Sequence, residues 1–260
     1  MDVVSLPEAD AYAKVARRGT ASTAPFLVAR NVSFQVSGRP IGPLTFDLPS
    51  FDVARTIALR GPSGAGKTTL FRHLLRLHPR ASGYVEIAGE PLSQPDREWL
   101  ASSIAYVPQR PVLFWRRTIA ENIAHATPGA SREQIIEAAR AACIHETIAC
   151  LKGSYDACMP RGVSGGEQSR IALARVFLTA APRLILADEP TTGIDRDTAD
   201  LIFDALRQFA AEKQAILLFT SHDSALVQKA DAIIDLPVMG VSSVVLSGTQ
   251  GRTIRVASPT

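Results

Sequence analysis

The chain has 260 residues, of which 46% are hydrophobic and 20% are charged, and its formal net charge is +3. This length accommodates one large domain or one domain with a sizeable insertion, and the composition is ordinary for a soluble globular protein. The small net charge gives no reason to expect nucleic acid, and no apolar run reaches the roughly 18–20 residues of a membrane-spanning helix. We therefore expect a cytoplasmic protein that reaches a membrane only through a partner.

Residues 1–25 contain no apolar core like that of a signal peptide, and we expect a flexible leader or a short accessory helix there. The three cysteines, Cys143, Cys150 and Cys158, have neither zinc-like nor redox spacing. We expect them to be buried thiols in a reducing cytoplasm.

From residue 26 onward, strand and helix patterns alternate. Strands are expected at 26–34, 45–48, 55–60, 83–88, 104–107, 184–187, 215–219 and 232–236, with turn residues at 38–43 and a possible edge strand at 241–246. Helices are expected at 67–77, at 118–124, after Ser131 as N-cap, at 144–151, at 196–211 and from His222. Alternation of this kind predicts a mostly parallel sheet with both faces covered, interrupted by a helical insertion.

The phosphate-loop pattern is matched at every fixed position by Gly61-Pro62-Ser63-Gly64-Ala65-Gly66-Lys67-Thr68. The glycines let successive backbone N–H groups face one anion, and the following helix N-terminus adds partial positive charge. We expect Lys67 to reach the β- and γ-phosphates, Thr68 to bind Mg²⁺, and Thr69 to support the α-phosphate. The pattern predicts a domain that binds a nucleoside triphosphate.

Two acids, Asp188 and Glu189, follow the apolar run 184–187. In open parallel sheets, ligands bind at the carboxyl edge of the strands. We expect Asp188 to hold Mg²⁺ through a water and Glu189 to act as base toward a water in line with the γ-phosphate. His222 follows the next apolar strand. A lone histidine is usually structural or exposed and often caps a helix start, but at this strand end it could instead hydrogen-bond the γ-phosphate.

From about Phe26 to Leu236, the chain resembles the ATP-binding cassette (ABC) superfamily. The resemblance rests on motifs in the family's order: Gly61–Thr69, Pro108-Gln109, Ser164-Gly165-Gly166, Asp188-Glu189, Gly193-Ile194-Asp195 and His222. It implies an α/β fold, a P-loop NTPase core with a mostly parallel sheet, an N-terminal antiparallel β subdomain and an inserted helical subdomain. The implied domain spans 26–240, with the helical subdomain at about 110–175 and a short tail at 241–260.

By resemblance, Gln109 senses Mg²⁺ and the attacking water, so the implied catalytic set is Lys67, Gln109, Glu189 and His222. The segment Ser164-Gly165-Gly166-Glu167, together with Asp195, contacts ATP bound to the opposite protomer. Two ATP molecules then join two copies of the cassette, and hydrolysis of ATP to ADP and phosphate releases them.

The sequence departs from the family pattern at several positions. The signature has Val163 and Glu167 in place of leucine and glutamine, and Gly193 replaces alanine. The family stacks adenine on an aromatic residue in the first strand, where this chain has Val36, so either Phe34 substitutes or base contacts are weaker. The pair Tyr155-Asp156 resembles the corresponding segment of exporter-type cassettes. Exporters often carry an acidic residue just before the following arginine-glycine pair, and this chain has Pro160 at that position.

The resemblance leaves two functional classes. The first is the ATP-hydrolysing subunit of a transporter, peripheral on the inner face of the cell membrane through a separate permease; the segment 108–123 resembles a groove for a permease helix. The alternative is a soluble ABC ATPase acting in DNA repair or translation. Such relatives carry coiled-coil arms or a second cassette, and this chain has neither, which favours transport. A domain cut from a fused exporter is a third possibility, against which Met1 and the leader argue weakly. Substrate selectivity would lie in the membrane partner.

Overall fold

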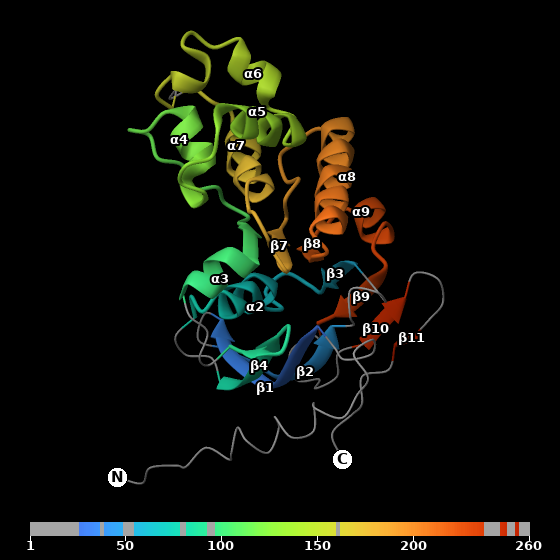
Figure 1. Ribbon diagram of the computed structural model, residues 1–260. Helices are drawn as coiled ribbons and strands as arrows, with labels where there is room; N and C mark the ends of the chain where they lie inside the picture. Colours follow the sequence, from blue (N-terminus) through green and yellow to red (C-terminus); the bar gives the residue numbers. More distant parts are fainter. Residues whose placement is uncertain are drawn as a thin grey trace.

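The computed structural model describes residues 26–36, 39–48, 55–78, 82–92, 97–159, 162–236, 245–248 and 253–254 (Figure 1). A four-stranded sheet has the order β2-β1-β4-β5, with β1 at Leu27–Val36, β2 at Arg39–Leu48, β4 at Ser82–Ile87 and β5 at Glu90–Pro91. A seven-stranded sheet has the order β11-β10-β9-β3-β8-β7-β6. Its strands are β3 (Thr56–Arg60), β6 (Ile104–Val107), β7 (Leu184–Asp188), β8 (Ile216–Thr220), β9 (Ala232–Asp235), β10 (Val245–Gly248) and β11 (Thr253–Ile254).

Most of the predicted helices are found near their predicted positions. They are α2 (Lys67–Leu74), α3 (Arg97–Ser103), α4 (Ile119–Ile123), α5 (Arg132–Ala141), α6 (His145–Ala149), α7 (Gly165–Phe177), α8 (Arg196–Glu212) and α9 (Ser224–Gln228). Ser131 caps α5 as predicted, because its side chain accepts the backbone N–H of Gln134. Helix α2 ends before the predicted Leu77, whose side chain is 66% exposed. Helix α3 and strand β5 were not predicted.

The predicted parallel core is confirmed, because β9, β3, β8, β7 and β6 pair in parallel. Successive side chains of a strand point to opposite faces, so each strand contributes to two cores. Ile185 and Ala187 face a core shared with α5, α7 and α8, whereas Leu184 and Leu186 face one shared with α2 and the four-stranded sheet. Burial on both faces explains why these strands are continuous apolar runs.

The N-terminal antiparallel sheet is also confirmed, since β1 pairs antiparallel with both β2 and β4. The predicted turn at 38–43 is too long, because β2 already begins at Arg39 and includes Pro40 and Pro43. As the edge strand of its sheet, β2 tolerates prolines that cannot donate to a ladder. Gly42, with φ +107, lies so close to the backbone of Val32 and Ser33 that a side chain would collide.

Helices α4 to α7 lie at the opposite end of the molecule from β1, β2 and β4, with the seven-stranded sheet between them (Figure 1). The cysteine prediction is wrong on burial: all three thiols are free, Cys150 and Cys158 are exposed, and Cys143 is half-buried. The predicted strand at 241–246 is found in part as β10, antiparallel to β9, but it is not the edge of the sheet, because β11 pairs with its other side; residues 241–244 lie outside the described residues. The leader at 1–25 also lies outside them. Within the described part of the chain, no helix has the length and apolarity needed to cross a bilayer.

Candidate active site

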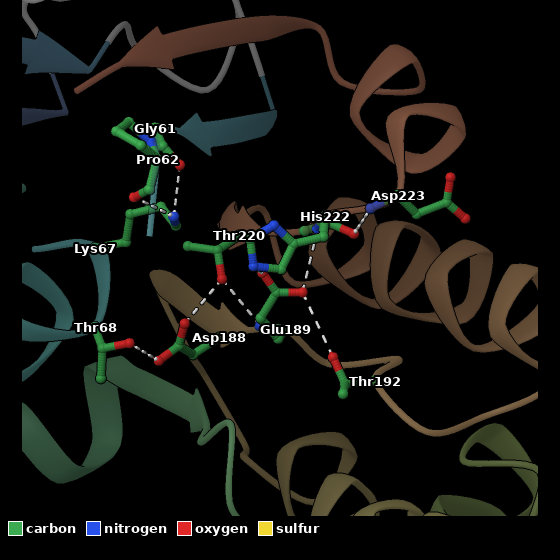
Figure 2. A network of polar contacts seen from close by, with 11 residues as sticks. Gly61, Pro62, Lys67, Thr68, Asp188, Glu189, Thr192, Thr220, His222 and Asp223 are labelled. Carbon is green, nitrogen blue, oxygen red and sulfur yellow. Dashed lines mark hydrogen bonds and ion pairs between the residues drawn. The ribbon is translucent and has the colours of Figure 1, made fainter. Parts of the chain in front are cut away.

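The phosphate loop, Gly61–Thr69, connects the carboxyl end of β3 to α2. Gly66 is the N-cap of α2 and has φ +92, a conformation that L side chains rarely adopt. The Nζ atom of Lys67 donates to the carbonyl oxygens of Gly61, at 2.7 Å, and Pro62, at 3.2 Å (Figure 2). One ammonium group is therefore held beside a glycine loop at a helix N-terminus, an arrangement suited to phosphate groups.

Asp188, the last residue of β7, joins this loop to the neighbouring strand β8. Its Oδ2 atom accepts a hydrogen bond from Thr68 Oγ1 at 2.7 Å, and its Oδ1 atom accepts one from Thr220 Oγ1 at 2.8 Å (Figure 2). Asp188 is 2% exposed and Thr220 is fully buried. A carboxylate beside a hydroxyl is an oxygen donor set of the kind that Mg²⁺ prefers, so the predicted pair Thr68 and Asp188 fits this ion.

Glu189 follows Asp188 in a left-handed conformation, with φ +53, and is 8% exposed. Its Oε2 atom accepts the backbone N–H of His222 at 3.2 Å and lies 3.5 Å from Thr192 Oγ1. Its Oε1 atom is buried and has no hydrogen-bond partner among the described residues, although His222 Nε2 lies 3.3 Å away. A buried carboxylate oxygen with an unused lone pair can accept a hydrogen bond from a water and then its proton.

His222 does not cap a helix, because the N-cap of α9 is Asp223, whose side chain accepts the N–H of Ala225 at 2.8 Å. The imidazole of His222 is 69% exposed and lies against Glu189. This excludes the first of the two roles considered for the residue. The contact with a phosphate group stays a prediction.

Gln109 follows β6, the strand that pairs with β7. Its side chain is exposed, and the described residues make no hydrogen bond between it and Thr68, Asp188 or Glu189. The structure therefore places Gln109 at the carboxyl edge of the sheet but does not bring it into the polar network of Figure 2.

The signature segment, Ser164-Gly165-Gly166-Glu167, begins α7 as a capping box. Ser164 Oγ accepts the N–H of Glu167 at 3.3 Å, and the Glu167 carboxylate accepts the N–H of Ser164 at 2.8 Å. Because glutamate closes this box, Glu167 in place of glutamine preserves the helix start. A pocket of about 610 Å³ lies here, and its described lining contains no residue of the phosphate loop; it is formed by Pro111, Ser164–Gly166, Gln168–Arg170 and Thr192–Asp195.

Asp195 borders the same pocket and is the N-cap of α8, where its Oδ1 accepts the N–H of Thr198 at 3.0 Å. This hydrogen bond, with a smaller contribution from the positive charge of Arg170, lowers the pKa of Asp195 below its ordinary value. Gly193 has φ +78, which accounts for glycine at a position where the family carries alanine. Val163 packs half-buried against the helical core.

The structure argues against Phe34 as the adenine-stacking ring. Phe34 is 2% exposed, and a Cβ on Gly66 would lie 2.8 Å from its ring, so the ring supports the phosphate loop from beneath. Its ring centroid lies 6.1 Å from that of His78, which covers it further. The side chain of Val36 and the residue Pro160 lie outside the described residues.

Two hydroxyl residues of the network, Thr192 and Thr220, were missed by the sequence analysis. The pattern that could have found Thr220 is its place at the end of a buried strand, between an apolar run and His222. Nothing in the local sequence indicates that its hydroxyl contacts a residue 32 positions away. Tyr106 in β6 also lies near Asp188, whose negative charge adds to burial in raising the tyrosine's pKa to about 12.

The parallel core, the phosphate loop and the acids at the carboxyl edge define a P-loop nucleotide-binding domain. The chain belongs to the ABC transporter family, because the family model described as "ABC transporter" matches residues 45–192. The family match confirms the predicted resemblance, and the relatives described next confirm its exporter-like character.

Three relatives illustrate the match. "ABC transporter B family member 24, mitochondrial" of Arabidopsis thaliana is 37% identical over 209 residues, which are 79% of this chain and 29% of the relative. "Alpha-hemolysin translocation ATP-binding protein HlyB" of Escherichia coli O157:H7 is 36% identical, over 68% of this chain and 25% of the relative. The solved structure of a bacterial Atm1-family ABC exporter with ATP bound superposes with a TM-score of 0.74 at 32% identity, over 82% of this chain and 37% of the exporter chain. The chain thus spans between a quarter and two fifths of these proteins.

Proposed function

We propose that this chain binds ATP with Mg²⁺ and hydrolyses it to ADP and phosphate as the energy-supplying part of a transporter. The observation that carries the proposal is the buried Oε1 atom of Glu189, which has no hydrogen-bond partner among the described residues and lies at the same sheet edge as the Thr68–Asp188 pair and the phosphate loop. A base, a metal-binding pair and a phosphate-binding loop are the parts that phosphoryl transfer to water requires.

Each part has a distinct role in the proposed reaction. Lys67 exchanges its carbonyl partners for the β- and γ-phosphates, while the glycine backbone of Gly61–Gly66 and Thr69 holds the remaining oxygens. Glu189 orients the attacking water through Oε1 and takes its proton. His222 donates to the γ-phosphate from its exposed ring, and Gln109 approaches from β6 when the site is occupied. Bound Mg²⁺, held by Thr68, Asp188 and Gln109, would neutralise charge on the β- and γ-phosphates.

A second copy of the chain completes each site in this proposal. The signature pocket shares no lining residue with the phosphate loop of its own chain, and its backbone N–H groups open a 13-residue helix. Ser164, Gly165, Gly166 and Glu167 then contact the γ-phosphate of ATP bound to the other copy, with Asp195 at the interface. Such a dimer forms with ATP and separates after hydrolysis.

A membrane permease is the second partner that we propose, and residues 110–117 form the surface that would receive it. We name this segment the docking loop. Val112 and Trp115 within it are 62% and 47% exposed, while Arg110, Arg116 and Arg117 surround them at the surface. Exposed apolar side chains of this size are typical of protein contact sites. The docking loop has no acidic residue, so a permease helix with apolar and acidic side chains would complement it.

The conformation of the docking loop is fixed by hydrogen bonds from Asn122 and Arg175. The buried side chain of Asn122 accepts the N–H of Phe114 at 2.8 Å and donates to the carbonyl of Phe114 at 3.0 Å. Arg175 of α7 donates to the carbonyl of Val112 at 2.7 Å and to that of Asn122 at 2.7 Å. The surface is therefore organised before any partner arrives, which lowers the entropic cost of binding. Through this contact the chain would lie on the inner face of the cell membrane.

The ATPase proposal is tested with Glu189→Gln and Lys67→Ala. Glu189→Gln keeps the shape of the side chain but loses the base, so we expect ATP binding to persist while steady-state hydrolysis falls by a factor of about 10²–10⁴. The ATP-bound variant should also elute as a dimer in size-exclusion chromatography. Lys67→Ala should lose nucleotide affinity, measured with a fluorescent ATP analogue. Normal turnover by Glu189→Gln, or normal affinity in Lys67→Ala, would contradict the assigned roles.

The permease proposal is tested by co-purification from detergent-solubilised membranes. We expect the wild-type chain to retain a polypeptide with membrane-spanning helices and Trp115→Ala to lose it. Leu77→Ala is the matched control, because Leu77 is an exposed apolar residue, 66% accessible, that follows α2 and lies outside the docking loop. Recovery of the chain with ribosomes or DNA would favour the soluble ABC ATPases instead.

A further inference from the structure

Thr220, the last residue of β8, has both sides of its hydroxyl engaged. Its Oγ1 atom donates to Asp188 Oδ1 at 2.8 Å and accepts the backbone N–H of Glu189 at 3.0 Å. The side chain is fully buried, so water does not compete for these contacts. One hydroxyl therefore touches both acids that follow β7 (Figure 2).

The first consequence concerns the orientation of the Asp188 carboxylate. Among the described residues, Thr220 makes the one hydrogen bond to Oδ1, while Thr68 makes the one to Oδ2. Because Thr220 occupies Oδ1, the carboxylate plane is set so that Oδ2 faces the phosphate loop. Hydrogen bonds of this kind to a ligating carboxylate tune metal affinity in other proteins by factors of 10–100.

The second consequence concerns the turn that carries Glu189. Glu189 has φ +53, and a residue with a Cβ pays for this left-handed conformation unless its surroundings hold it there. Its N–H is shared between the backbone oxygen of Thr220, at 3.2 Å, and the hydroxyl of Thr220, at 3.0 Å. The hydroxyl thus helps to hold the backbone that directs the Glu189 carboxylate toward His222.

We propose that Thr220 is a positioning residue of the ATPase site, whose hydroxyl orients the metal-binding carboxylate of Asp188 and the turn bearing the base Glu189. The inference rests on the proposed function and adds a residue that contacts neither ATP nor the water. Its effect passes entirely through the two acids.

The test compares Thr220→Val, which removes the hydroxyl and keeps the shape, with Thr220→Ser, which keeps the hydroxyl. The matched control is Thr56→Val, because Thr56 is 3% exposed on β3 of the same sheet, at the end opposite the phosphate loop. Two quantities are measured on the 260-residue chain: ATP affinity with EDTA and with Mg²⁺, and the Mg²⁺ concentration for half-maximal hydrolysis. A general loss of folding stability would lower both affinities together, whereas the proposed role affects only the Mg²⁺-dependent gain.

We expect Thr220→Val to keep its metal-free ATP affinity within twofold, while half-maximal hydrolysis requires about 10–100 times more Mg²⁺. Thr220→Ser should return both values to those of the wild type, and Thr56→Val should match the wild type. If Thr220→Val is not recovered folded, Thr220→Cys, with a weak S–H donor, is measured in the same way.

The inference would be overturned if Thr220→Val required the same Mg²⁺ concentration for half-maximal hydrolysis as the control Thr56→Val. A Thr220→Ser variant as impaired as Thr220→Val would overturn it as well, because the methyl group and not the hydroxyl would then matter. A wild-type chain that neither binds nor hydrolyses ATP would instead overturn the proposed function, a result that is distinguishable because it appears before any substitution is made.

Discussion

The carbonyl oxygen of Gly193 lies 2.9 Å from the position that a Cβ on Gly166 would occupy. The two glycines belong to different parts of the site: Gly166 to the first turn of α7, and Gly193 to the turn between β7 and α8. Their backbones therefore meet without an intervening side chain. This close approach fixes the start of the signature helix against the segment that follows the base.

The contact predicts opposite effects for two adjacent glycines. Gly166→Ala should lower the free energy of unfolding and disturb the turn at Gly193, because the Gly193 carbonyl is backbone and cannot rotate away. Gly165→Ala should leave the free energy of unfolding unchanged or raise it by up to about 1 kcal/mol, since a Cβ there meets open space and alanine favours helix. Urea denaturation of both variants measures the difference. Equal stability of the two would show that the turn yields freely.

The capping box at Ser164 predicts that a substitution there affects both stability and hydrolysis, whereas loss of an equivalent cap elsewhere affects stability alone. Ser164→Ala removes an N-cap, which costs about 1 kcal/mol, and under the dimer proposal it also removes a contact with ATP on the other copy. Ser131→Ala removes a capping box of the same type from α5 and serves as control. We expect similar losses in urea unfolding and unchanged nucleotide binding by the monomer, but slower hydrolysis only for Ser164→Ala. Loss of monomer binding would count against the shared site.

The hydrogen bonds between Asn122 and the docking loop predict a large effect on stability at a residue distant from the phosphate loop. Asn122→Ala removes the side-chain partner of the Phe114 N–H and one of two donors to each of the Phe114 and Thr118 carbonyls, from a fully buried position. We expect a loss of about 1–3 kcal/mol in urea denaturation, because the Phe114 N–H is left without a hydrogen bond while the two carbonyls each keep one. Thr127→Val, which loses one hydrogen bond to Leu178, should cost less than half as much.

A pH dependence of stability is predicted from His73 in α2. Burial, with a smaller repulsion from His78, lowers the pKa of His73 below its ordinary value, and Nε2 has no hydrogen-bond partner among the described residues. At this residue the unfolded chain therefore binds the proton more tightly than the folded chain, so the contribution of His73 to stability is lost as the pH falls below about 6.5 and is constant above that pH. His73→Gln should reduce this slope in thermal unfolding between pH 7.5 and 5.5. An unchanged slope would assign the pH dependence to other groups.

Much of the fold was predictable because its signals are local. Buried parallel strands such as 184–187 are apolar runs of strand length, and Ser131 marks a helix start three residues before Gln134. The phosphate loop was predictable for a similar reason, since its glycines and Lys67 are contiguous and their spacing follows from the geometry of the turn.

The remainder depends on contacts between distant segments. Thr68 and Asp188 are 120 positions apart, and only the sheet order brings them together. The same sheet order places Thr220 beside Asp188, and the packing of the four-stranded sheet turns Phe34 inward beneath Gly66, against the stacking role considered for it. The exposed cysteines and the prolines of β2 were missed because exposure and edge position are properties of the assembled fold.

Helix α7 begins at the signature segment and carries Arg175 near its other end, where that side chain holds the docking loop. At 1.5 Å per residue, the two ends are separated by about 16 Å of continuous helix. A continuous helix of this length moves as a rigid body. Displacement of the first turn of α7 by a nucleotide would therefore be carried by the helix backbone to Arg175, whose side chain would pass it directly to the docking loop.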